Sequence, residues 1–157
     1  MALPRPLSRG GLVLESPAFA NGARIPDRYS CSGRGVSPPL RWHGVPADAI
    51  ELALTVIDVE APGGQYVHWT MWGLNPRRTS LRAGQVPPRA VQGVNSKGTV
   101  GWTPPCPPAG TPAHHYVFTL YALSDAVALP PGAAPGSLLR RTATSVASAS
   151  VIGRFGR

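Results

Sequence analysis

The chain has 157 residues and a mass of 16.4 kDa, with 43% hydrophobic and 14% charged residues. This length and composition predict one folded domain with its own core, and they exclude a disordered chain. Nineteen prolines and eighteen glycines without a regular period exclude collagen. They also disfavour long helices, because both residues interrupt helix interiors. Short strands joined by turns are therefore expected.

The net charge of +8 comes from 14 arginines and one lysine against seven acidic residues. A basic balance of this size can attract phosphates, nucleic acid or anionic membranes. The arginines are scattered, and only Arg77-Arg78 and Arg140-Arg141 are adjacent. We therefore interpret the charge as a solvated basic surface, and we do not expect specific nucleic-acid binding.

The two cysteines, Cys31 and Cys106, lie far apart and form no CxxC pair, so no zinc site or thioredoxin-type site is predicted. They are interpreted either as free thiols or as one disulfide. The sequence contains no run of 18 apolar residues and no apolar segment typical of a signal peptide. We therefore expect no membrane span, no metal, no cofactor and a soluble, cytoplasmic protein.

Residues 1–10 have the composition of a flexible terminus, and a single domain is predicted over residues 11–157. Residues 21–46 contain many turn-forming residues and are interpreted as an ordered surface excursion. Glu51–Asp58 alternates apolar and other residues with a period of two, which predicts a half-buried strand with Ala53 and Thr55 on its outer face.

Residues 67–74 form a second β-rich run, and the two runs are predicted to pair as a hairpin. That hairpin would place Asp58 and His68 at the same end of a sheet. His114–Leu123 is the clearest predicted strand, and residues two apart on a strand share a face, so His114 and Tyr116 should point the same way.

The C-terminal part is less well determined by local pattern. Residues 137–145 are predicted to form a short helix capped by Ser137. Residues 146–155 are compatible with either a helix or a strand.

Several segments together resemble the phosphatidylethanolamine-binding protein family, in its prokaryotic branch related to Raf-kinase-inhibitor-like proteins. The resemblance covers the chain from about residue 12 to its C-terminus and is carried by residues 26–33, 36–42, 58–62, 67–69, 93–95, 106–108 and 114–123. It implies a mainly β fold, in which a large antiparallel sheet packs on a smaller one. One or two short helices near the C-terminus are also implied.

The resemblance further implies a pocket at one end of the sheet for a small anion, such as phosphate, a carboxylate or a phospholipid headgroup. The matching positions in this chain are Asp58, Pro62, His68, Pro105, Cys106, Pro107, His114 and Tyr116. Isolated histidines on strands are usually structural, but the family context favours ligand contact for both. For Tyr116, ligand contact and a place in the core are equally supported. Asp58 is expected to orient His68 or to accept a hydrogen bond from a ligand ammonium or hydroxyl group.

This chain departs from the family pattern at Val59, Pro104 and His115, where the family usually has proline, glycine and arginine. The effect of these departures on selectivity is left open. Glu60 replaces an aspartate of the pattern and is expected to be exposed.

We therefore expect a non-enzymatic binding protein, and the resemblance leaves room for a kinase or hydrolase partner and for a homodimer. One alternative is a hydrolase that uses Cys106 or a serine as nucleophile, with His68 or His114 as base and Asp58 as the orienting acid. A second alternative is nucleic-acid binding through the basic surface. The sequence has no GxSxG, HExxH or P-loop motif, which favours binding over catalysis.

Overall fold

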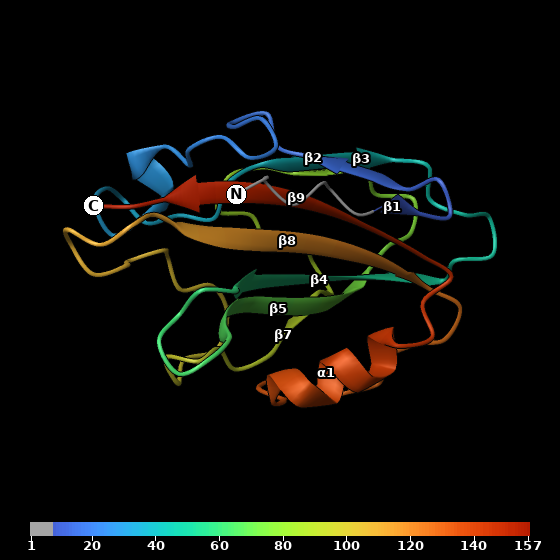
Figure 1. Ribbon diagram of the computed structural model, residues 1–157. Coiled ribbons are helices and arrows are strands. Elements are labelled where there is room, and N and C mark those ends of the chain that lie inside the picture. The colour runs from blue at the N-terminus through green and yellow to red at the C-terminus, as the bar shows by residue number, and fades with distance from the viewer. Residues whose placement is uncertain (1–7) are drawn as a thin grey trace.

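The three strongest β patterns of the sequence form the middle of the larger sheet in the computed structural model, which describes residues 8–157 (Figure 1). They are β4 (Glu51–Asp58), β5 (Tyr66–Leu74) and β8 (His114–Leu123). β4 lies between the other two strands and pairs with both in antiparallel register. The predicted hairpin and the predicted strand at 114–123 are thus confirmed.

The larger sheet has the strand order β1-β9-β8-β4-β5-β7, where β7 is Val91–Gln92. β9 (Ala147–Phe155) pairs along its length with β8, which resolves the ambiguity between helix and strand at 146–155. β1 (Ser8–Arg9) pairs with the start of β9, so these two residues belong to the sheet and not to a flexible terminus. Residues 1–7 of that predicted terminus lie outside the described residues.

The smaller sheet consists of β2 (Val13–Glu15), β3 (Leu40–His43) and β6 (Ser80–Leu81), in the order β2-β3-β6. It packs against one face of the larger sheet, and the main core lies between them (Figure 1). The segment 21–46 contributes buried Ile25, Tyr29 and Trp42 to this core. It also contains a 3₁₀ turn, η1 (Asp27–Tyr29). The predicted surface excursion is therefore partly a core element.

The other face of the larger sheet carries the helix α1 (Pro135–Thr142) and the segment before it (Figure 1). Leu138 of α1 and Val127 pack with Ala53 of β4 in a second, smaller core. Ala53 and Thr55 are both buried, so the prediction of a half-buried β4 was wrong. The sequence pattern of one strand does not show that a helix distant in the chain covers the second face of that strand.

The helix begins two residues before the predicted start. Its N-cap is Ala134, which makes no side-chain cap, and Pro135 occupies the first turn. Proline suits this position because its missing N–H would have no partner within the helix. The predicted Ser137 cap was therefore wrong, and the Ser137 hydroxyl instead accepts from Arg140 at 3.3 Å. In residues 8–157, no helix is long and apolar enough to span a bilayer.

Candidate functional site

Polar side chains converge at the edge of the sheet where β4 ends and β5 and β8 begin. Asp58, the last residue of β4, lies in register with Tyr66 of β5 on one side and Tyr116 of β8 on the other. His68 is two residues from Tyr66, and His114 is two residues from Tyr116, so each pair shares a face of its strand. The predicted neighbourhood of Asp58, His68, His114 and Tyr116 is present in the structure.

These residues line a cavity of about 400 Å³, which we call the histidine cavity. It is lined by seven of the eight residues predicted as ligand contacts: Asp58, Pro62, His68, Cys106, Pro107, His114 and Tyr116. Pro105 is not part of the lining, and its carbonyl accepts from the Cys31 N–H at 3.0 Å. Ligand contact by the seven residues stays a prediction.

Asp58 orients His114. The Oδ2 atom of Asp58 accepts a hydrogen bond from Nδ1 of His114 at 2.7 Å, with both side chains largely buried. Its other oxygen, Oδ1, accepts from the Glu60 backbone N–H at 2.9 Å and turns the chain out of β4. The expectation that Asp58 orients His68 was therefore wrong, because β8 brings a second histidine closer to the carboxylate.

His68 is held by the backbone instead. Its Nδ1 donates to the carbonyl oxygen of Thr103 at 2.7 Å, and Thr103 N–H donates back to the His68 carbonyl at 2.9 Å. Burial lowers the pKa of His68 below its usual 6.5, and nearby His114 acts in the same direction. The Thr103 hydrogen bond and Asp58 oppose this shift but do not cancel it. His68 is therefore mostly neutral at pH 7.

The two histidines thus share one arrangement. In each ring Nδ1 donates to a protein oxygen, which leaves Nε2 as the ring atom without a protein partner among the described residues. Nε2 of a neutral ring accepts a hydrogen bond, whereas Nε2 of a protonated ring donates one to an anion. The pair can consequently bind an oxyanion when a proton is taken up.

Tyr116 belongs to both the core and the cavity. It is only 1% exposed, and its ring meets that of His68 edge to face at 5.1 Å. Burial raises the pKa of Tyr116, and the negative charges of Asp58 and Glu60 raise it further. The phenol therefore keeps its proton and remains a hydrogen-bond donor.

Cys31 and Cys106 form a disulfide, with their Cα atoms 5.3 Å apart, and both residues line the histidine cavity. The bond joins the loop after η1 to the proline-rich loop before β8. It decides between the two interpretations of the cysteines. It also removes Cys106 as a free thiol nucleophile, which corrects one form of the hydrolase alternative.

The lining also includes Cys31, Ala61, Tyr66, Lys97, Thr103 and Pro108, none of which was predicted as a ligand contact. Lys97 is the only lysine of the chain, and this rarity was the one feature of the sequence that could have drawn attention to it. Its loop is held by the buried Asn95, whose side chain bonds to Lys97 N–H at 3.0 Å and to the Gly101 carbonyl at 2.8 Å. Tyr66 could have been found from the hairpin, because it lies opposite Asp58.

Glu60 is partly exposed and pairs with Nδ1 of His115. This agrees with its expected exposure. The two acidic residues at the end of β4 therefore each have a histidine partner from β8. Among the described residues, no group of three His, Cys, Asp or Glu side chains is arranged to hold a metal ion.

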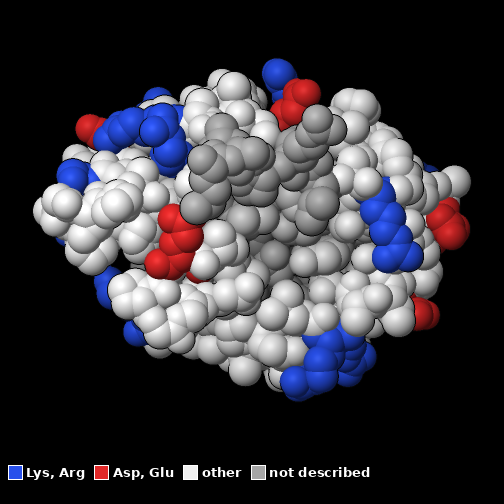
Figure 2. Space-filling model, viewed as in Figure 1, with Lys and Arg blue, Asp and Glu red and all other residues white. Residues whose placement is uncertain are grey.

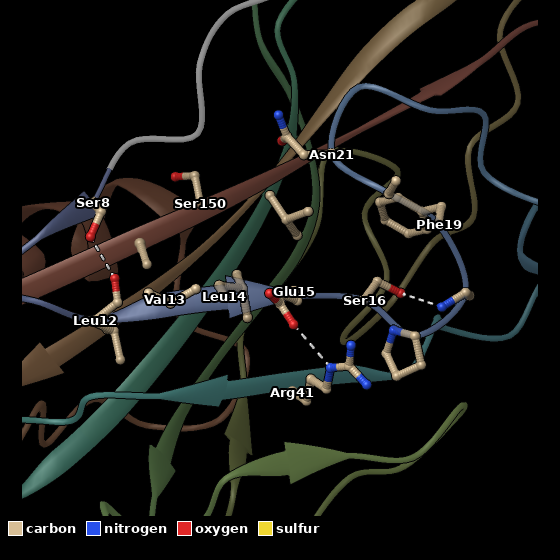
Figure 3. Close-up of a pocket in the computed structure, with 15 residues that line it drawn as sticks. Ser8, Leu12, Val13, Leu14, Glu15, Ser16, Phe19, Asn21, Arg41 and Ser150 are labelled. Carbon is tan, nitrogen blue, oxygen red and sulfur yellow. Dashed lines mark hydrogen bonds and ion pairs between the residues drawn. The ribbon is translucent and has the colours of Figure 1, made fainter.

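A second and larger cavity, of about 780 Å³, lies between β2 and β9 (Figure 3). Its walls are mostly aliphatic, and Figure 3 shows the Glu15–Arg41 ion pair, at 3.0 Å, on one side. Within residues 8–157, no histidine, cysteine or tyrosine lines it. Of these two cavities, the histidine cavity is the one lined by histidine, cysteine and tyrosine side chains.

The sequence profile described as phosphatidylethanolamine-binding protein matches residues 15–156. The chain belongs to the phosphatidylethanolamine-binding protein family. This identification, together with the two antiparallel sheets and the single C-terminal helix, confirms the predicted family and fold class.

Solved structures of this family have the same fold. A homologue from Chlamydia trachomatis superposes with a TM-score of 0.88 at 36% identity, covering 94% of this chain and 99% of the other. Escherichia coli YbcL superposes with a TM-score of 0.87 at 27% identity, with the same coverage of 94% and 99%.

Curated relatives are also prokaryotic, as predicted. A UPF0098 protein of Methanothermobacter thermautotrophicus is 41% identical over 150 residues, which cover 92% of this chain and 98% of that protein. A Mycobacterium tuberculosis protein named "Putative lipoprotein LppC" is 52% identical over 122 residues, or 78% of this chain. The match spans only 60% of that longer relative.

Proposed function

We propose that this chain is a non-enzymatic binding protein for a small molecule that carries a phosphate or carboxylate group. The histidine cavity is the proposed site. The observation that carries the proposal is the matched arrangement of His68 and His114, whose Nδ1 atoms donate to Thr103 and Asp58. Each ring is thereby fixed with Nε2 available to a ligand. The name of the family makes a phospholipid headgroup one candidate source of the phosphate.

Anion binding in this cavity is coupled to protons. A neutral Nε2 repels an anionic oxygen, and the buried Asp58 carboxylate adds to the repulsion. Protonation of His68 reverses the sign of its contribution, and Tyr116 supplies a phenol donor whose proton is retained. The proposed site therefore binds phosphate more tightly at pH 6 than at pH 8.

Two observations weigh against the hydrolase alternative. Cys106 is held in a disulfide, and within residues 8–157 no serine lines the cavity. The Asp58–His114 pair has the form of an oriented base, but the nucleophiles that the alternative required are not beside it.

Nucleic-acid binding through the basic surface is likewise not favoured. Figure 2 shows the Lys and Arg side chains of one face in separate groups, with acidic groups between and beside them. A nucleic-acid-binding protein usually has a continuous basic patch or stripe on its surface. The absence of specific nucleic-acid binding stays a prediction, as do a kinase or hydrolase partner and a homodimer.

We also propose an oxidising compartment for this chain, in place of the cytoplasm expected from composition. Disulfides persist in extracytoplasmic environments and are rare in a reducing cytosol. The Cys31–Cys106 bond and the lipoprotein name of one relative support this proposal. Alkylation of thiols in freshly lysed cells tests it, because a protein from the cytoplasm would be recovered with both cysteines labelled.

The experiment that tests the binding function is a titration of phosphate followed by the ring signals of the four histidines, at pH 6.0 and pH 7.5. We expect the signals of His68 and His114 to move, more at pH 6.0. The signal of His43, an exposed residue of β3, is the internal control. Unmoved His68 and His114 signals would contradict the proposal, as would phosphate binding that survives in the His68→Gln/His114→Gln double variant.

A further inference from the structure

The acidic groups near the histidine cavity are already occupied by protein partners. Asp58 accepts His114 Nδ1 with one oxygen and the Glu60 N–H with the other, at 2.7 and 2.9 Å. Glu60 pairs with His115. An ammonium group entering the cavity would have to share these carboxylates with their present donors, which already offset part of the negative charge.

Lys97 is the one Lys or Arg residue, among those described, that lines the cavity. It forms no ion pair with any described residue, so its charge is available to a ligand. Its backbone N–H is fixed by the Asn95 side chain, and Asn95 is itself only 3% exposed. The backbone position from which the Lys97 side chain extends is therefore held in place.

Apart from Tyr66 and Thr103, the remaining wall of the cavity is apolar. Ala61 and the rings of Pro62, Pro104, Pro107 and Pro108 line it beside the disulfide. Such a wall offers aliphatic contact to the carbon body of a ligand and no hydrogen-bond acceptor from its side chains. The polar end of the cavity therefore suits an anionic group, and the rest suits an uncharged body.

We propose that Lys97 makes this cavity select phosphate monoesters with an uncharged carbon body over zwitterionic esters that carry an ammonium group, such as phosphoethanolamine. The inference rests on the proposed anion-binding function and narrows its ligand class. Lys97 attracts the phosphate of both kinds of ester, but it also repels the ammonium group of the zwitterion. Because Lys97 is exposed, the effect is the modest one of a surface charge, about two- to fivefold in affinity.

A matched pair of ligands tests this selectivity by calorimetric titration at pH 6.0. Propyl phosphate and phosphoethanolamine have the same chain length and differ by a methyl group in place of the ammonium group. The wild type should bind propyl phosphate about two- to fivefold more tightly. Lys97→Gln should bind the two ligands about equally, and Lys97→Glu should prefer phosphoethanolamine. Arg82→Gln and Arg82→Glu, at an exposed position outside the cavity lining, should keep the wild-type ratio.

A vesicle arm distinguishes the source of the monoester. Phosphatidylcholine vesicles containing phosphatidic acid should retain the wild type more strongly than Lys97→Glu if the ester comes from a lipid. Binding of propyl phosphate without any vesicle binding assigns a free ester, and both results support the selectivity.

Equal wild-type affinity for the two esters would overturn the inference, as would an unchanged ratio in Lys97→Glu. Those results leave the anion site in place, since both esters still bind. If neither ester nor inorganic phosphate binds the wild type, the proposed function itself is wrong.

Discussion

Nδ1 of His114 donates to Oδ2 of Asp58 across 2.7 Å, in a pair whose side chains are only 11% and 6% exposed. The pair joins the end of β4 to the start of β8. Because it is buried, removing one member leaves the other without its partner in a poorly solvated place.

The first prediction follows from that burial. Asp58→Ala removes the acceptor for His114 and the acceptor for the Glu60 N–H, and should lower the free energy of unfolding by about 1–3 kcal/mol. Urea unfolding measures the change. Glu15→Ala is the matched control, because it breaks an ion pair to Arg41 whose side chains are both more than half exposed. That change should cost less than about 1 kcal/mol, and equal costs for the two variants would contradict the assignment.

The second prediction concerns pH. The folded pKa of His68 lies below its unfolded value near 6.5, so the unfolded chain binds the proton first as pH falls. The contribution of His68 to stability is therefore complete above pH 6.5 and declines as pH falls toward the folded pKa. The melting temperature should fall between pH 7.5 and pH 5.

Phosphate should reduce that fall, because it binds the protonated cavity. The comparison is thermal unfolding in chloride and in phosphate at equal ionic strength. His68→Gln should weaken the pH dependence, and His43→Gln should leave it unchanged. A His68→Gln variant with the full pH dependence would show that another group is responsible.

The third prediction addresses the disulfide. Cys31 and Cys106 are 75 residues apart, so their bond restricts a long loop in the unfolded chain. Its reduction should lower the free energy of unfolding by about 2–4 kcal/mol. Phosphate should also bind more weakly, because both cysteines line the cavity. Unfolding with and without dithiothreitol measures the effect. The Cys31→Ser/Cys106→Ser variant should be insensitive to the reductant, and equal stability of the oxidised and reduced forms would refute the prediction.

The fourth prediction concerns Pro104, which lines the cavity where the family pattern has glycine. Pro104→Gly restores a backbone N–H, worth about 0.5–1.5 kcal/mol to phosphate binding if it reaches the anion. It also frees the unfolded chain and loosens Thr103, the acceptor of His68, so the melting temperature should fall. Val59→Pro, at an exposed loop position, removes the N–H that donates to the His115 carbonyl at 3.3 Å, so it should lower the melting temperature and leave phosphate binding unchanged. Calorimetry and thermal unfolding measure both, and a Pro104→Gly variant with weaker binding and unchanged melting would contradict the prediction.

Much of this protein could be predicted from local pattern and family motif. The alternation in Glu51–Asp58 and His114–Leu123 determined two central strands, because a period of two places alternate side chains on opposite faces. The short turn-containing stretch between β4 and β5 determined the hairpin, and the hairpin brought Asp58 and His68 to one end of the sheet. The family motifs added His114 and Tyr116 to the same site.

Other features were decided only by contacts between segments distant in the chain. The partner of Asp58 is His114, 56 residues away, because β8 lies beside β4 in the sheet. Lys97 reaches the cavity because buried Asn95 shapes its loop. Residues 147–155 form a strand because the edge of β8 was available to their backbone hydrogen bonds. Sheet neighbours, loop placement and disulfide pairing depend on the packing of the whole chain, and local periodicity carries no information about them.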